Sequence, residues 1–548
     1  MQRRNACMRR RHCLATLAAL PTATWADSKE GSDLESPYEG LDWQQVLPLH
    51  SMSHQHQGLT AASLEVFRGM GYGHMAFSNY YPSKPTYPLQ ADFTRAHPEV
   101  IAAPNAEHHS FLDSGLHCNA LGSLLSTGFG REVPAAARAV SPILQRFEGL
   151  NLFAGPRPWE GVYRLDVGLQ GDRAEAEARL DLRGAVACKL KPGFEEVGAV
   201  QQRSLKAGSH SFYLRLQQPV LELELRFDLS AMKVTQLRLM QGCNRPWREF
   251  FKAALDGEMV EGKRQGGLLH ADGGGLTLNH PTGALKDYAP MLDFDERVLG
   301  IEVWNQLTSG FGSSRGFYDH SMEAPMHFYR LWDEILRSGR RCWGFFVKDH
   351  NTFGRGRNVL LLPPMTGLEP PQREALALRA YRRGCFFGAV SALAHNEAGE
   401  VVAPYDQSGF AFQRLEVIRD AQGRAQALEV AVGGQDAARR PQVQIRLIGE
   451  GGVLEVADAA RARLALPREA SGRLQSAFFR VEAVAYPRTH LQGRELRAEQ
   501  VRGMSVGQLS RLHDRLVALG SSAVGKDPAL RQPLPIADLI FSQPLRRV

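Results

Sequence analysis

The residues with the clearest chemical potential are three histidines within seven positions of the segment LHSMSHQHQG, namely His50, His54 and His56. His54 and His56 form an HxH pair at the end of an expected strand. Side chains at positions i and i+2 of a strand point to the same face, so both rings can reach one cation. His50 is a further candidate, with a surface or supporting position as its alternative. An isolated HxH pair is weak evidence for a divalent metal site, which needs further ligands from elsewhere in the chain.

A second group of polar residues occurs in PNAEHHSFLDSGLHCNALGS, which contains Glu107, His108, His109, Asp113 and His117. A carboxylate can bridge two cations while an imidazole binds one of them, so this segment supplies the ligand type that the HxH pair lacks. The alternative interpretation is a polar loop with incidental histidines.

Two later segments place further ligand types just after apolar stretches. They are LNHPTG with His280, and FFVKDHN with Asp349 and His350. Ligands at the carboxyl ends of strands would open onto one face, as a β/α barrel active site requires. Arg355 and Arg357 follow closely in NTFGRGRN and could bind an anionic substrate group through two hydrogen bonds each. A solvated loop is the alternative for these two arginines.

The pattern around these residues predicts several structural units, because 548 residues are too many for one core. Strand and helix patterns alternate before residue 155 and again after residue 267. Between them, period-two alternation predicts an inserted antiparallel β domain, and the chain beyond residue 396 is strand-rich. The predicted division is 40–155 and 267–395 for the mixed unit, 156–266 for the insert, and 396–548 for a C-terminal β-sandwich-like domain.

The N-terminal residues 1–26 have five arginines and no acidic residue, then an apolar run, then small residues before Asp27. This order predicts an export signal of the twin-arginine or Sec type, and hence a periplasmic or extracellular protein. Without those arginines the formal charge of +7 falls to +2, so nucleic-acid binding has little support. No apolar run approaches the length of a transmembrane helix.

The order of motifs resembles the PHP (polymerase and histidinol phosphatase) domain family, in particular its exported hydrolase-like members. The motifs are HxH, AEHH with a later histidine, NHP, GIEVWN and LWDEILRSGRRCWGFFVKDHN, and they cover about 42–150 and 267–390. The resemblance implies an α/β fold with a distorted (β/α)7 barrel. It implies catalytic roles for Glu107, Asp349 and His350. The metal ligands that it implies are His54, His56, Glu107, His117, His280 and Asp349.

The sequence departs from the family pattern at two places. In AFSNYYPS, Asn79 and Tyr80 stand where two ligands are expected, which leaves Tyr80 as a residue that could line the substrate pocket. Asp349 is followed directly by His350 and Asn351, where Asp-x-His is usual. We therefore expect one or two divalent ions, Mn, Zn or Fe, and fewer than three.

These features together predict an exported metal-dependent hydrolase that uses metal-activated water. A phosphoesterase acting on a small-molecule or glycan-linked anionic substrate is the favoured form. The alternatives are a catalytically degenerate PHP-like protein that binds a glycan or envelope component, and a hydrolase of a non-phosphate bond such as an amide or ester.

Overall fold

The structure is a computed structural model of the chain. It describes residues 32–56, 60–81, 86–111, 113–127, 148–171, 177–183, 188–192, 203–228, 232–241, 245–260, 262–305, 327–350, 356–391, 409–434, 442–486, 490–491, 494–495 and 538–548. The predicted export signal, Asn351 and Arg355 lie outside the described residues.

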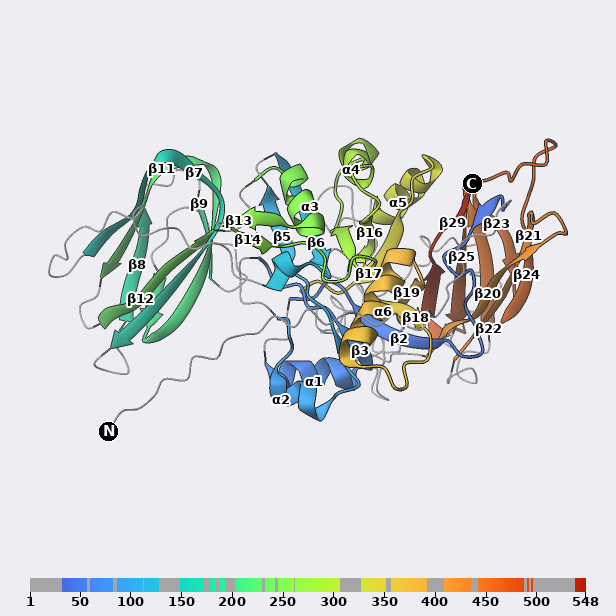
Figure 1. Ribbon diagram of the computed structural model, residues 1–548, viewed down its shortest axis with the longest axis horizontal. Coiled ribbons are helices and arrows are strands. Elements are labelled where there is room, and N and C mark those ends of the chain that lie inside the picture. The colour runs from blue at the N-terminus through green and yellow to red at the C-terminus, as the bar shows by residue number, and fades with distance from the viewer. Residues whose placement is uncertain are drawn as a thin grey trace.

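A five-stranded mixed sheet lies in the middle of the molecule, in the order β17-β16-β15-β6-β5 (Figure 1). β15, β16 and β17 run parallel, whereas β6 is antiparallel to both of its neighbours. β16 and β17 are buried along their whole length, as is typical of parallel strands covered on both faces. The strands are β5 (Glu107–Phe111), β6 (Ser114–Leu121), β15 (Gly275–Leu278), β16 (Val298–Asn305) and β17 (Trp343–Val347).

A larger mixed sheet runs in the order β1-β29-β25-β28-β19-β18-β2-β3-β4, with β22 and β23 attached at β25. β2, β3 and β4 run parallel, and the other pairs are antiparallel. The strands are β1 (Leu34–Glu35), β2 (Leu47–Met52), β3 (Tyr72–Met75), β4 (Ile101–Ala102), β18 (Gly356–Leu362), β19 (Phe386–Val390), β22 (Gln442–Gly449), β23 (Gly452–Ala457), β25 (Phe478–Tyr486), β28 (Asp538–Ser542) and β29 (Leu545–Arg547).

Helices cover these two sheets. Apolar side chains at helical spacing on α5, among them Leu331, Trp332 and Ile335, enter the core beside β16. α6 packs against β18 and β4, and α1 packs against β3. No helix in the described part of the chain is long and apolar enough to cross a membrane. The helices are α1 (Ala61–Gly69), α2 (Ala91–Ala96), the 3₁₀ turn η1 (Leu124–Thr127), α3 (Trp247–Asp256), α4 (Leu285–Leu292), α5 (His327–Arg337) and α6 (Pro370–Arg383).

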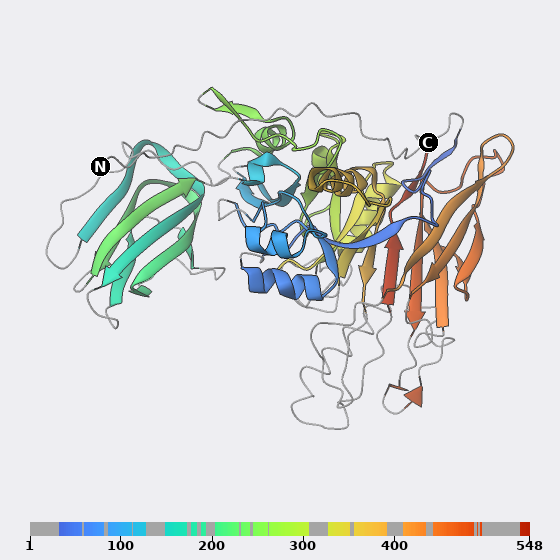
Figure 2. The ribbon, with the colours of Figure 1, turned by 60° about the horizontal axis from the view of Figure 1, so that its bottom comes forward.

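A separate antiparallel sheet lies at one end of the molecule (Figures 1 and 2). Its strands all fall within residues 148–241, whereas the period-two pattern predicted an insert over 156–266. α3 follows this sheet and packs in the core against β6 and β15. The strands are β7 (Glu148–Gly171), β8 (Glu177–Arg183), β9 (Cys188–Pro192), β10 (Arg203–Lys206), β11 (Gly208–Asp228) and β12 (Met232–Gln241).

The C-terminal residues are rich in strands, and part of them completes the larger sheet. β28 pairs with β19, and β29 pairs with β1 near the N-terminus. A three-stranded sheet of β20 (Ala411–Arg419), β21 (Ala425–Gly433) and β24 (Arg461–Ala465) shares a core with the larger sheet through Leu428, Ile445 and Val481. Two short hairpins are β13 (Glu258–Val260) with β14 (Lys263–Gln265), and β26 (His490–Leu491) with β27 (Arg494–Glu495).

The predicted α/β fold with a distorted (β/α)7 barrel is wrong. Such a barrel needs a closed ring of strands and a helix after almost every strand. The described residues instead form mostly strands, arranged in large mixed sheets, and contain six α-helices. Antiparallel pairs of β18 with β2 and of β19 with β28 extend the larger sheet outward and keep it open. The motifs of the resemblance are present, but the architecture around them is different.

Candidate metal centre

The six predicted metal ligands meet where strands of the two sheets come together. His54 and His56 follow β2, Glu107 begins β5, His117 lies in β6, and His280 and Asp349 each stand two residues after a strand, β15 and β17. Main-chain hydrogen bonds hold the HxH segment beside the end of β17. Asp349 N donates to His54 O at 3.1 Å, and His56 N donates to Asp349 O at 3.3 Å. Both imidazoles therefore face the carboxylate of Asp349.

Two of these residues have left-handed backbone conformations that non-glycine residues rarely adopt. The φ angle is 27° at His280 and 56° at Asp349. Such conformations cost on the order of 1–3 kcal/mol each and persist where the surroundings impose them. Here they turn the chain sharply as it leaves β15 and β17. The strain therefore lies at the two ligands that follow the parallel strands β15 and β17.

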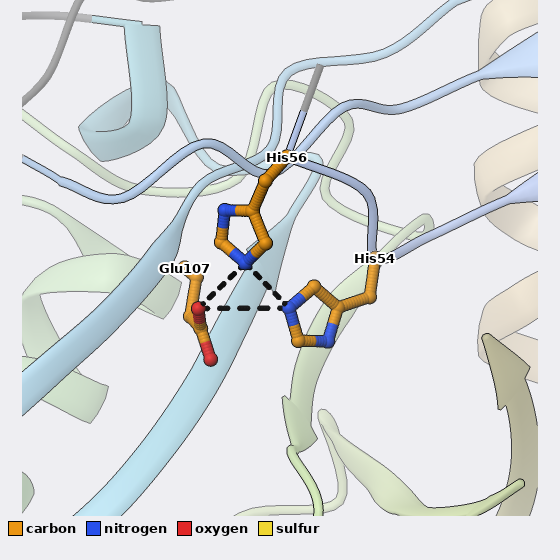
Figure 3. A group of neighbouring side chains, drawn as sticks. All are labelled: His54, His56 and Glu107. Carbon is orange, nitrogen blue, oxygen red and sulfur yellow. Dashed lines mark hydrogen bonds and ion pairs between the residues drawn. The ribbon is translucent and has the colours of Figure 1, made fainter. Parts of the chain in front are cut away.

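The first ligand group consists of His54, His56 and Glu107, whose side chains converge on one point (Figure 3). The two Nε2 atoms are 3.1 Å apart, and Glu107 Oε2 lies 3.0 Å from His56 Nε2 and 3.5 Å from His54 Nε2. Metal–ligand bonds of ~2.1 Å give ligand–ligand edges of about 3.0 Å in octahedral and about 3.4 Å in tetrahedral sites. Asp349 Oδ1 adds a fourth ligand atom, 3.3 Å from His56 Nε2.

The second ligand group uses the other oxygen of Glu107. Glu107 Oε1 lies 3.0 Å from His117 Nδ1 and 3.2 Å from His280 Nε2. Asn279 Nδ2 also donates to this oxygen, at 3.0 Å. The carboxylate of Glu107 thus stands between two clusters of imidazole nitrogens, which is the position of a bridging ligand.

Burial and charge at Glu107 fit a cationic occupant. Its side chain is fully buried, and Oε2 accepts no hydrogen bond within the described part of the chain although it faces two imidazoles. A buried carboxylate oxygen is stabilised only by a hydrogen bond or a cation. Burial acts to raise the pKa of Glu107, but His54 and His117 outweigh it and hold that pKa well below its usual value. The residues present therefore suit divalent cations.

The same carboxylates act on the histidines. Burial acts to lower the pKa of His54, but Asp349, Glu302 and Glu107 overcome it and raise this pKa well above 6.5. The pKa of His280 is also raised, because the carboxylate of Glu107 outweighs the effect of burial. Without a cation, the carboxylates therefore favour the protonated form of both imidazoles, and a metal ion competes with that proton.

A third group lies beside the first one. His56, Asp349 and His350 each offer a ligand atom to a common point. His350 Nε2 is 3.6 Å from Asp349 Oδ1 and 3.0 Å from the hydroxyl of Tyr80, and its ring stacks on that of His56 with 4.1 Å between centroids. Tyr80 thus contacts the edge of the centre, and its role in lining a substrate pocket stays a prediction.

Glu302 and Asn305, both from the segment GIEVWN, support the centre. Glu302 Oε1 lies 2.5 Å from His54 Nδ1, and its other oxygen accepts hydrogen bonds from His280 N and Asn305 Nδ2. Asn305 Nδ2 also donates to Asp349 Oδ2 at 3.0 Å. The sequence signal was a glutamate within the apolar strand GIEVWN, because a carboxylate buried on such a strand must be paired.

The other predicted site residues have different surroundings. Arg357 is 3% exposed, and its guanidinium donates to the hydroxyl of Ser391. Its neighbour Asn358 donates to Ser53 Oγ at 3.0 Å, so Arg357 points to the opposite face of β18. Asn79 approaches the centre through its backbone, because Glu107 N donates to Asn79 O at 3.3 Å. A substrate-binding role for Arg357 stays a prediction.

Comparison with known proteins gives no family for this chain. No protein-family model matches it, and no match was found among curated proteins. The likeness to the PHP family therefore rests on the motif residues alone. The structure brings the six motif residues of that likeness into one buried centre that could hold metal ions.

Proposed function

We propose that this protein is a metal-dependent hydrolase that acts on a phosphoester, with chemistry similar to that of the PHP family. The observation that supports this most is the position of Glu107, with one carboxylate oxygen facing His54 and His56 and the other facing His117 and His280. A carboxylate shared in this way is typical of centres that hold two cations close together. Such pairs stabilise both the attacking and the leaving oxygen of an in-line displacement.

The donor set indicates the kind of ion. Imidazole with carboxylate suits Zn, Mn and Fe better than Ca or Mg, which prefer oxygen alone. When bound, such ions supply Lewis acidity and lower the pKa of water toward neutrality. The chain's own contribution is to fix the ligands: Asn279 and Glu302 hold Glu107 and His54 by hydrogen bonds before any ion arrives.

The phosphoester assignment rests on the family resemblance and on the paired ligand groups. Tyr80 and His350 lie at the border of the centre, with Tyr80 OH 3.0 Å from His350 Nε2, and are placed to contact a substrate group. An N-terminal export signal would put this activity outside the cytoplasm. Hydrolysis of an ester or amide would use the same ligands, so the substrate panel below includes both.

The test combines metal analysis with activity. Protein purified without chelators is analysed for bound Mn, Fe and Zn, and is then assayed on phosphomonoesters, phosphodiesters, carboxyl esters and amides with each metal added. We expect about two ions per chain and the highest kcat/KM on a phosphoester. Glu107→Gln should lose metal and reduce kcat/KM by more than the 10–100-fold that is typical of a residue outside the ligand shell.

The matched control is Glu334→Gln, which makes the same change at an exposed position of α5. It should keep the metal content and activity of the parent. If the parent protein binds metal but hydrolyses none of these substrates, the assignment as a hydrolase is refuted. If it hydrolyses only a carboxyl ester or an amide, the proposal that its substrate is a phosphoester is refuted.

A further inference from the structure

An arginine-lined pocket lies at the other end of β17 from the metal centre. β17 begins at Trp343 in this pocket and runs toward Asp349, about 20 Å away at ~3.3 Å per residue. The pocket has a volume of about 780 Å³, which is within the ~300–1,000 Å³ usual for small-molecule sites. Its wall includes Pro37, Arg341, Trp343, Arg382, Arg383 and Arg546.

Some charges in this pocket are neutralised by partners. Arg379 Nε donates to Asp272 Oδ2 at 2.7 Å, and Arg546 pairs with Glu35 at 2.6 Å. Glu39, another lining acid, is paired with Arg419 at 2.9 Å. These pairs leave little net charge on their side of the pocket.

Arg341 and Arg382 are different, because the acceptors of both guanidinium groups are backbone carbonyls. Arg382 Nε donates to Gly274 O at 2.7 Å and its NH2 group to Gly273 O at 3.3 Å, and Arg341 donates to Glu296 O. In the described structure, no carboxylate lies within ion-pair distance of either group. Both side chains are half-buried. Glu296 also lines the pocket and attracts both groups, but its side chain is exposed, where water screens its charge.

Positive charge is crowded around the two guanidinium groups. Burial, together with Arg297 and Arg341, lowers the pKa of Arg382 to about 10. Burial and the neighbouring Arg546 also lower the pKa of Arg341. Two partly desolvated cations that repel each other would be stabilised by a negative charge between them.

We propose that this pocket binds a small organic dianion, held through the guanidinium groups of Arg341 and Arg382. A guanidinium presents paired N–H donors that match the oxygens of a phosphate ester or a carboxylate. The ring of Pro37 and the small exposed part of Trp343, which is 5% exposed, supply apolar surface for the organic part of the ligand. This site is separate from the metal centre and does not depend on the function proposed for it.

The test measures binding of two matched aromatic dianions, phenylphosphonate and phthalate, by isothermal titration calorimetry on the full protein. The first represents phosphate esters and the second represents dicarboxylates. We expect at least one of them to bind with a Kd below about 1 mM, and Arg341→Gln with Arg382→Gln to weaken that binding about tenfold or more. The preferred probe identifies the chemical class of the ligand.

Arg340→Gln is the control, because Arg340 is adjacent in sequence but pairs with Asp293 at 2.8 Å and does not line the pocket. It should bind the probe like the parent. If the double variant does not fold, Arg341→Lys and Arg382→Lys singly keep the charge but lose the paired donors, and each should weaken binding severalfold. Absence of saturable binding in the parent would overturn the proposal. Binding that the arginine variants leave unchanged belongs to another site, such as the metal centre, and would overturn it as well.

Discussion

The Nδ1 atom of His54 lies 2.5 Å from Oε1 of Glu302, a carboxylate from a strand almost 250 residues later in the chain. The contact turns Nε2 of His54 toward Glu107. The second oxygen of Glu302 accepts a hydrogen bond from the backbone N of His280 at 2.7 Å. One buried carboxylate therefore orients a ligand of the first group and anchors a ligand of the second group, so both groups depend on it.

The first prediction concerns this contact. Glu302→Gln keeps the shape of the side chain but removes its charge and replaces one acceptor oxygen by a donor, so His54 and His280 can no longer both be held. We expect metal affinity to fall about 10–100-fold, as is typical for the partner of a metal-bound histidine. Titration with Zn or Mn against a competing chelator measures this. Glu334→Gln, at an exposed position, should bind like the parent, and equal affinity in Glu302→Gln would show that the contact does not orient the ligand.

The second prediction concerns the number of ions. Because Glu107 lies between two ligand groups, the parent should hold two ions, fewer than the three of the family pattern. His280→Ala removes an imidazole from the second group only and should lose one ion, whereas Glu107→Gln should lose most of both. Native mass spectrometry counts the ions directly. Three ions in the parent would mean that His350, with His56 and Asp349, completes a third site.

The third prediction concerns the pH dependence of metal binding. In the metal-free protein nearby carboxylates outweigh burial and raise the pKa of both His54 and His280, so both rings keep a proton to higher pH than an ordinary imidazole does. A metal ion must displace these protons, so metal affinity should rise as pH increases from 6 to 9 and binding should release protons. Calorimetry in buffers of different ionisation enthalpy measures the proton release. Affinity that does not change over this range would contradict the raised pKa values.

The candidate site could be predicted because its residues follow apolar segments and are histidines and carboxylates, which can bind the same kind of divalent ion. His117 and His280 are separated in sequence by the antiparallel sheet, yet both contact the same oxygen of Glu107. The role of Glu302 as a partner of His54 could not be predicted, since the sequence shows a buried carboxylate but not which residue pairs with it. That pairing depends on how β16 and β2 lie in space.

The fold could not be predicted from the same motifs. Local patterns indicate where strands begin and end, but pairing between distant segments leaves little trace in them. β19 pairs with β28, almost 150 residues later, and β1 pairs with β29 at the other end of the chain. These long-range antiparallel pairs make the larger sheet open, where the resemblance implied a closed barrel. The ligand motifs constrain the ends of a few strands and say little about the remaining ones.

The last prediction concerns acid stability and a histidine outside the metal centre. His74 is fully buried, its Nδ1 lies 2.6 Å from Ser51 Oγ, and its Nε2 forms no hydrogen bond in the described structure. Burial lowers its pKa to about 3, so the folded protein keeps this ring neutral. The unfolded chain binds a proton there below its ordinary pKa of about 6.5. Protons therefore favour unfolding between these two values, and His74 should cost stability on the order of 1 kcal/mol per pH unit as pH falls through this window.

His74→Gln keeps a polar side chain that cannot titrate, and should make the free energy of unfolding less steeply dependent on pH between about 6.5 and 3. The variant is expected to be less stable than the parent near pH 7, because it loses the ring's packing against Tyr381, whose centroid is 5.9 Å away. Urea unfolding at several pH values, with a chelator present to remove metal effects, gives both quantities. Parallel pH profiles for the parent and His74→Gln would show that the buried ring does not cause the loss of stability in acid.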